Sequence, residues 1–459
     1  MIGLPPFLSF SENERILQLK ILMIILRTVK NISSLNIAAS VLLFLAAILA
    51  AVVANSSLSP VYQDFLLQEL HLRIGNFNLF SHGGHPLKMI EFINDCLMTV
   101  FFLAVGLEIK RELLVGELSS VRKAALPFIA ACGGMVVPVV IYALSVASST
   151  PETRGMAIPM ATDIAFSLGV LSLLGKRVPL SLKIFLTAFA VVDDIGGILV
   201  IALFYSADVA YGYLIAAAVL YVFLYYMGKF GVTQKIFFLF FGVIIWYLFL
   251  QSGIHSTISG VILAFVIPAR PRLDAGKYIE RIRDIIGEFP VSKSDNIVLT
   301  NAQIATLKQV ERASDYVISP LQSLEDNLHG AVSFVILPLF AFANAGVVFS
   351  GSGSIVGDVS IAVAAGLLLG KFLGIYLFTW LAVKSGVALM PAGMNWKNIA
   401  GVSLLGGIGF TVSLFIANLS FADEYPELLN QAKFGVLVGT VLAGVLGYVV
   451  LNWVLPKRD

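Results

Sequence analysis

Charged side chains are scarce in this chain. Lysine, arginine, aspartate and glutamate together make up 13% of its 459 residues, against about a quarter in an ordinary soluble domain. The 30 basic and 28 acidic residues nearly cancel, and no basic domain stands out. A nucleic-acid partner is therefore not expected, because binding one needs concentrated positive charge.

Cysteine is rarer still. Cys96 and Cys132 lie in apolar segments without the spacing of a disulfide framework or a zinc site. The N-terminal 30 residues also lack the basic start, short apolar core and small-residue cleavage site of a secretory signal. Residues 15–30 instead have the pattern of an interfacial helix whose cations contact lipid headgroups. A flexible cytoplasmic leader is the alternative.

Apolar side chains, by contrast, make up 58% of the chain, and the mean hydropathy is +0.92. They gather in runs of about 18 or more residues, long enough to cross a bilayer as helices. This pattern predicts an all-α polytopic membrane protein. We place about twelve transmembrane helices near residues 36–55, 91–110, 124–147, 156–175, 181–205, 208–228, 233–250, 254–267, 328–350, 358–383, 398–420 and 432–455. The eighth is short for a crossing, and we expect it to be tilted or partly unwound.

The lysines and arginines give these spans an orientation. If the N-terminus is cytoplasmic, 25 of the 30 fall on the cytoplasmic side of the membrane. One cation, Lys371, lies inside the tenth span. The opposite side holds only Arg73, Lys88, Arg154 and Lys433. By the positive-inside rule, both termini are expected in the cytoplasm.

The chain is predicted to be one membrane domain, residues 36–459, behind a leader at 1–35. Residues 268–327 form a polar cytoplasmic insertion, in which KYIERIRDIIGEF has the pattern of an amphipathic surface helix. A linker without function is the alternative reading of this insertion. Residues 56–90 form an external loop with room for a short hairpin.

Few ionisable residues lie well inside the spans. They are Asp95, Asp163, Asp193, Asp194 and Lys371. Each charge at this depth costs about 2.5–3.5 kcal/mol on insertion scales, so such residues point to a functional site. Four acids and one base are also unbalanced, whereas a purely structural role would favour paired charges.

Asp193 and Asp194 are adjacent in the stretch AVVDDIGG. Two neighbouring carboxylates repel each other unless one holds a cation or a proton. On a helix their side chains point about 100° apart. We therefore expect one to pair with Lys371 and the other to face a water-filled cavity. The alternative is a structural ion pair beside a permanently protonated aspartate.

Two spans carry helix-breaking residues near their middles. Span four, AIPMATDIAFSLG, contains Pro159 before Thr162 and Asp163, and span eleven contains Gly406 and Gly407 in LLGGIGFT. Both are predicted to be discontinuous, which a membrane tolerates only beside protein or a cavity. Spans 3–5 and 10–12 would then be inverted repeats, and discontinuous helices at matching places point to a transport site. Close helix packing is the alternative role for the glycines.

Long stretches of the chain match a known pattern. Together they resemble the NhaA-type sodium/proton antiporter family, from about residue 36 to the C-terminus: INDCLMTVFFLAVGLEIKREL, ATDIAFSLGVLSLLGKRVPLSLKIF, AFAVVDDIGGILVIALFY, GIHSTISGVILAFVIP, ILPLFAFANAGV, GLLLGKFLGI and LLGGIGFTVSLFIANLSF. That family is itself a standard example of inverted repeats, so the two arguments are not independent.

The resemblance implies a secondary transporter of the bacterial inner membrane that extrudes sodium or lithium ions in exchange for protons. It implies pH regulation and electrogenic transport, and thereby a role in sodium and pH homeostasis. The ions are substrates, so no cofactor is expected, and the protein is not expected to be an enzyme. The bilayer is the expected surrounding partner. The resemblance also suggests a homodimer with the external hairpin at the contact.

Site residues follow from the resemblance position by position. Asp194 matches the central carboxylate that binds Na+ or Li+, and Asp193 its partner, which pairs with Lys371 or joins the ion shell. Thr162 and Asp163 match positions in the broken helix. Asp95 matches an acid of the second span near the access funnel.

Four further residues match positions linked to the pH response or to the cytoplasmic entrance: Glu108, His255, Glu325 and His329. Two of them have plainer alternatives: His255 as a histidine packed at a span boundary, and Glu108 as a solvated helix-end acid. The sequence departs from the family in its longer insertion at 268–318. Asp326 also stands where the family has a histidine, which affects the pH set-point rather than the exchange chemistry.

Three other functions compete with ion exchange. Sodium-coupled uptake of an organic anion needs a free cationic pocket, and Lys371 is the only candidate. An intramembrane aspartyl protease has YD and GxGD signatures, whereas the acids here lie in ATDIA and VVDDIG. A passive channel does not call for paired discontinuous helices.

Overall fold

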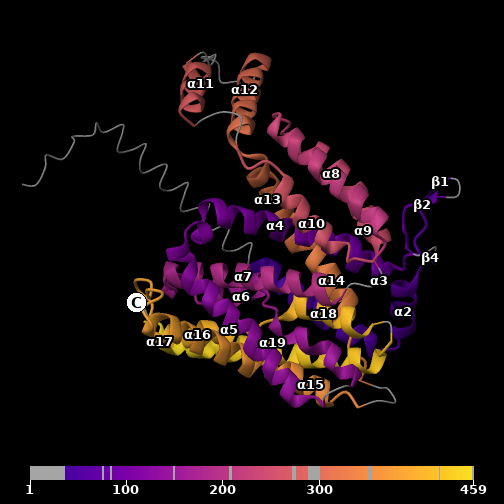
Figure 1. The fold of residues 1–459 in the computed structure, drawn as a ribbon. Helices are drawn as coiled ribbons and strands as arrows, with labels where there is room; N and C mark the ends of the chain where they lie inside the picture. Colours follow the sequence, from indigo (N-terminus) through magenta and orange to yellow (C-terminus); the bar gives the residue numbers. More distant parts are fainter. Residues whose placement is uncertain are drawn as a thin grey trace, which may run out of the picture.

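The structure is a computed structural model. It describes residues 37–74, 77–82, 85–147, 150–205, 209–270, 275–287, 300–349, 354–422 and 424–456. The predicted leader, residues 1–35, lies outside the described residues. Figure 1 shows a bundle of roughly aligned helices with short strands at one end.

Nine helices in the described part are long and apolar enough to cross a membrane. Three contain a π-helical turn: Met89–Val115 (α3 Met89–Phe92, η1 Ile93–Leu97, α4 Met98–Val115), Pro320–Asn344 (α13 Pro320–Ala331, η5 Val332–Ile336, α14 Leu337–Asn344) and Asp358–Lys384 (α15 Asp358–Ala365, η6 Gly366–Gly370, α16 Lys371–Lys384). The others are Ile37–Ala54, α5 Val121–Ser145, α7 Leu180–Phe204, α8 Tyr211–Lys229, α9 Lys235–Ser252 and α19 Pro426–Val454.

Two further spans are broken, as predicted. The 3-10 helix η3, Pro151–Met160, meets α6, Ile164–Leu173, at 45°, and α17, Trp396–Leu405, meets α18, Phe410–Phe421, at 44°. Counting each pair as one span gives up to eleven in the described residues. The expected short span is α10, Thr257–Val266, whose length alone does not establish a crossing. The all-α polytopic class is therefore confirmed, whereas the count of twelve is not.

One helix begins earlier than hydropathy predicts. The ninth span was expected from residue 328, but α13 begins at Pro320. The Ser319 side chain caps it by accepting a hydrogen bond from Gln322 N at 3.2 Å, and proline suits the first helical turn. The polar residues that follow have the hydropathy of a loop, so the span prediction missed the first two turns.

The helices form two bundles, each held by dense contacts. The first bundle contains α5, η3–α6, α7, α15–α16, α17–α18 and α19; the second contains α4, α8, α9, α10 and α13–α14. In the first bundle, spans 3–5 and 10–12 each have the broken helix in the middle. The bundles meet along a seam where α4 contacts α7 and α14 contacts α18.

The two faces of the molecule differ in their loops. One face, which we call the outer face after the orientation expected from the sequence, carries α2, Ser59–Leu67, and two antiparallel ladders, so a short hairpin is present within residues 56–90 as expected. The ladders pair β1 Arg73–Ile74 with β2 Phe77–Asn78, and β3 Ser81–His82 with β4 His85–Pro86. We call the opposite face, with its many lysines and arginines, the basic face. The insertion between α10 and α13 contains α11 (Ala275–Gly287) and α12 (Asn301–Val317). The helix predicted in KYIERIRDIIGEF is present as α11, and with α12 it extends away from the bundles (Figure 1).

Glycines allow α5 and α16 to touch. A Cβ atom on Gly374 would clash with the backbone of Gly133, and one on Gly133 would meet Gly374 and Phe378. We expect Gly374→Ala to lower the free energy of unfolding by about 1–3 kcal/mol, because a packed interface has no room for the methyl group. Thermal unfolding in detergent measures the change.

The matched control is Gly197→Ala in α7, where an added Cβ meets no atom within 4 Å. This change should be neutral or slightly stabilising, since alanine is the better helix former. Equal stability of the two variants would contradict the packing argument.

Candidate functional site

The two broken helices cross in the first bundle and satisfy each other's backbone. The Thr162 hydroxyl donates to the carbonyl of Gly406 at 2.8 Å, and the Asp163 N–H donates to the carbonyl of Ile408 at 2.6 Å. On the other side of the break, Ser413 Oγ donates to a carbonyl of η3 at 2.7 Å. Unwound backbone inside a membrane needs such partners. Glycine also permits close packing at the break, because a Cβ on Gly406 would clash with a neighbouring side chain.

Asp163 lies at the start of two helices at once. Its carboxylate accepts from Phe166 N at 3.0 Å, which caps α6, and from Thr411 N at 3.2 Å, in the first turn of α18. The Thr411 hydroxyl adds a third hydrogen bond at 2.7 Å. Helix N-termini carry partial positive charge. Asp163 is therefore placed to offset both positive ends.

Lys371 pairs with Asp193, which is one of the two roles that the family resemblance implies for Asp193. Its Nζ lies 2.6 Å from Asp193 Oδ2 and donates to the Thr162 hydroxyl at 2.9 Å, and both charged side chains are 0% exposed. The ammonium also lies 5.6 Å from the centre of the Phe189 ring. The other oxygen, Asp193 Oδ1, is buried and has no hydrogen-bond partner among the described residues.

Asp194, in contrast, lines a cavity of about 320 Å³. Thr162, Asp163 and Thr411 line the same cavity, and Asp193 does not. In the described part of the chain, no hydrogen bond or ion pair holds the Asp194 carboxylate. The expected division between the adjacent aspartates is therefore present: one is neutralised by Lys371, and the other lines an inner space.

The inner cavity reaches toward the basic face. Glu108 and Arg111 of α4 and Glu325 and His329 of α13 line it. Arg111 Nε lies 2.9 Å from Glu325 Oε1, and its Nη1 lies 3.0 Å from Glu112 Oε1. Glu108 thus shares a cavity with Asp194 and is not merely a solvated helix-end acid.

Asp326, which we expected to depart from the family pattern, is exposed and does not line the inner cavity. It places a negative charge on the surface beside Glu325, while Glu325 and His329 line the cavity.

Two of the predicted residues lie elsewhere. Asp95 and His255 line an outer cavity of about 690 Å³, together with residues of the external loop such as Glu69 and Lys88. The Ser256 hydroxyl lies 3.2 Å from Asp95 Oδ1. The four candidate pH-response residues therefore do not form one cluster, because His255 is separated from the other three by the centre of the protein.

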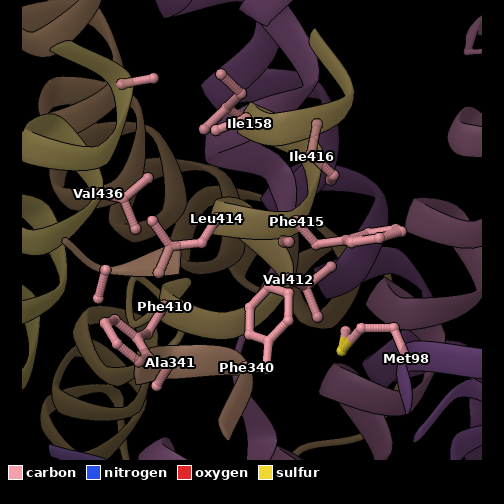
Figure 2. Packing of buried hydrophobic residues seen from close by; sticks show 14 of the residues in the cluster. Met98, Ile158, Phe340, Ala341, Phe410, Val412, Leu414, Phe415, Ile416 and Val436 are labelled. Atoms are coloured by element: carbon pink, nitrogen blue, oxygen red, sulfur yellow. The ribbon is translucent and has the colours of Figure 1, made fainter. Parts of the chain in front are cut away.

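A buried apolar layer divides the inner from the outer cavity, and α18 crosses it. Thr411 lines the inner cavity and Asn418 the outer one. Between them, the Phe415 ring lies 5.7 Å from that of Phe102 and 6.4 Å from that of Phe340. Figure 2 shows Phe340 and Phe415 in this buried cluster. The layer closes the seam between the bundles.

Each π-helical turn lies at one of the two cavities or beside the buried lysine. Asp95 lies in η1, Ser333 of η5 lines the inner cavity, and Lys371 directly follows η6. Wide turns of this kind are frequent at functional sites. They shift the helix register by one residue, which periodicity in a sequence does not reveal.

Several polar residues near the cavities were not predicted from the sequence. Arg111 was not named as a site residue, although it holds Glu325 at the cavity mouth. Asn94, Asn344 and Asn418 were not singled out, although each stands in an apolar stretch. An uncharged amide within an apolar run is a weak signal, but it was present in the sequence. Among the described residues, no group of three or more His, Cys, Asp and Glu is arranged as a metal site.

These features define a class of protein. Two helix trios, each with a broken helix in the middle, and carboxylates where the breaks cross are the arrangement of a secondary transporter. The chain belongs to the Na+/H+ antiporter 1 family, whose family model matches residues 30–451. The family resemblance seen in the sequence is thereby confirmed.

Named relatives are similar over nearly their whole length. The chain is 75% identical over 436 residues to the Na(+)/H(+) antiporter NhaA of Bacteroides fragilis, covering 95% of this chain and 100% of the relative. It is 62% identical over 413 residues to that of Phocaeicola vulgatus, covering 90% and 92%. For Porphyromonas gingivalis the identity is 47% over 441 residues, covering 95% and 97%.

The buried ion pair yields a stability prediction. Lys371→Ala should lower the free energy of unfolding by about 3–5 kcal/mol, because it leaves Asp193 charged in a dry interior. Thermal unfolding in detergent would show the loss. Lys384→Ala, in the last turn of the same helix and exposed, is the matched control and should change little. An unaltered melting temperature for Lys371→Ala would rule out the ion-pair role.

Proposed function

We propose that this protein exchanges sodium or lithium ions for protons across the bacterial inner membrane, with both termini in the cytoplasm. The proposal rests on the observation that the buried acids have different surroundings. Lys371 neutralises Asp193, while Asp194 and Asp163 share a cavity toward the basic face. The family and the names of its members agree with this chemistry.

The inner cavity offers the ligands that a small hard cation prefers. Carboxylate, hydroxyl and carbonyl oxygens bind such ions. Asp194 supplies a carboxylate without a competing partner in the described residues, and Asp163 supplies a second. The Thr162 hydroxyl already donates to Gly406 and accepts from Lys371, which leaves it one lone pair for an ion.

Exchange follows from competition for the same oxygens. A protonated carboxyl is a poor ligand for sodium, so loading protons releases the metal ion and loading sodium releases protons. Glu108, Glu325 and His329 line the path from the basic face, and Arg111 is the cation among them. We propose that protonation of Glu108, Glu325 and His329 makes transport depend on cytoplasmic pH. This dependence would serve sodium and pH homeostasis.

The exchange is proposed to be electrogenic. Asp194 and Asp163 can each release a proton when one sodium ion enters, and the Lys371–Asp193 pair is a third group that can release one. More protons than sodium ions then cross per cycle. The membrane potential contributes about 2.3 kcal/mol per net charge per 100 mV. Such coupling lets the proton gradient and the potential together expel sodium.

The competing functions fit the structure less well. An organic anion would need a free cation at the site, but Lys371 is 2.6 Å from Asp193. An open channel would need a continuous path, but Phe415 and its neighbours close the seam. The proposal requires no resident cofactor, because the ions are the substrates. A homodimer through the outer-face ladders remains part of the proposal and rests on family likeness.

Asp194→Asn should abolish exchange, because the amide can neither release a proton nor neutralise sodium. Everted membrane vesicles holding a preset ΔpH test this: sodium or lithium should dissipate ΔpH with the wild-type chain and not with the variant. Asp326→Asn, an exposed position off the cavity, should retain exchange. Robust exchange by a well-inserted Asp194→Asn protein would refute the central role of this carboxylate.

Competition also predicts a pH dependence. The sodium concentration that half-saturates exchange should rise as pH falls, by up to about tenfold per pH unit for each proton that competes at the site. Measuring it in vesicles over a series of pH values gives the slope. A half-saturating concentration that does not change with pH would mean that sodium and protons do not share a site.

A further inference from the structure

Three asparagines meet near the floor of the outer cavity. Asn94 lies in η1, Asn344 ends α14, and Asn418 lies in α18. Asn344 Nδ2 donates to Asn94 Oδ1 at 2.8 Å, and Asn418 Nδ2 donates to Asn344 Oδ1 at 2.9 Å. Asn344 is 0% exposed, whereas Asn94 and Asn418 line the outer cavity.

The two hydrogen bonds differ in what they join. Asn94 and Asn344 both belong to the second bundle, so their contact lies within one body. Asn418 belongs to the first bundle, so its bond to Asn344 crosses the seam. Each side chain also bonds its own helix: Asn344 to Phe340 O at 3.0 Å and Asn418 to Leu414 O at 2.8 Å. The amide of Asn418 is thus held in the orientation that reaches Asn344.

The asparagines form a second layer behind the aromatic one. Phe340 lies one helical turn before Asn344 on α14, and Phe415 lies about one turn before Asn418 on α18. Passing from the inner to the outer cavity, the seam therefore presents the Phe340–Phe415 contact and then the Asn344–Asn418 bond. Buried amides are costly unless paired, and hydrogen bonds between helices hold them together in a membrane.

We propose that Asn418 and Asn344 are the latch of the outer gate, which holds the two bundles together while the inner cavity is open. The inference rests on the proposed transport function, since a gate serves a cycle in which the site opens to each face in turn. Opening outward then requires the amide bond and the aromatic contact to part together. Asn94 acts as a positioning residue that fixes the amide of Asn344.

A labelling experiment tests the latch without using transport. In a Cys96→Ser, Cys132→Ser background, Val412→Cys places a thiol at the inner cavity, where Val412 is 4% exposed. A membrane-impermeant methanethiosulfonate is then applied from the outer side of right-side-out vesicles. Adding Asn418→Ala should raise the labelling rate about threefold to tenfold, the population shift expected from losing one hydrogen bond between helices.

The matched control is Asn398→Ala, another buried asparagine of the first bundle that lies away from the seam. It should leave the labelling rate unchanged. Should Asn418→Ala fail to insert, Asn344→Ala carries the same expectation. Unchanged labelling in an inserted latch variant, or an equal rise with Asn398→Ala, would overturn the latch.

Cross-linking gives an independent test. In the same background, Asn344→Cys with Asn418→Cys joins the two bundles when oxidised, and exchange should stop and return on reduction. Asn94→Cys with Asn344→Cys joins residues of one bundle and should exchange in both states. Two results would contradict the latch. One is exchange by the protein cross-linked between positions 344 and 418, and the other is loss of exchange when the 94–344 pair is oxidised. If the unmodified protein shows no exchange, the proposed function fails, and the labelling result still decides the latch.

Discussion

A helix that breaks inside a membrane exposes backbone groups that lipid cannot satisfy. In this protein two such breaks lie across each other, and each supplies partners for the other. Asp163 is central to the arrangement, because its carboxylate accepts hydrogen bonds at the start of α6 and from Thr411 at the start of α18. The crossing that brings acids to the middle of the bundle is therefore held by backbone partners and by one side chain that serves two helix ends.

The pairing of the buried charges determines what Asp194 can do. Lys371 is held by Asp193 and Thr162, so this buried cation is already engaged. Asp194 is left lining the inner cavity, beside Asp163. The seam between the bundles then separates this site from the outer cavity by an aromatic layer and an amide layer. A transport cycle needs only to open one end of that seam as it closes the other.

Much of this could be predicted from the sequence. The five charged residues inside apolar runs, the breaks near Pro159 and Gly406, and the sidedness of the lysines and arginines follow from the cost of burying charge and free backbone. Other features could not be predicted this way. Helix α13 begins in a polar stretch because of a serine cap, and His255 lies with Asp95 rather than with Glu108. Hydropathy reports the affinity of a segment for lipid, and it carries no information on which cavity a side chain faces.

By itself, the sequence determined that this is a multi-span membrane protein with acids and one lysine at depth, since apolar length and charge cost are local properties. Only the tertiary structure decided which aspartate holds the lysine. Adjacent side chains point about 100° apart on a helix, so either could have faced α16. Tertiary packing likewise brought Asn94, Asn344 and Asn418 together from segments far apart in the chain, because a hydrogen bond across a seam depends on where helices lie, and no local pattern records that.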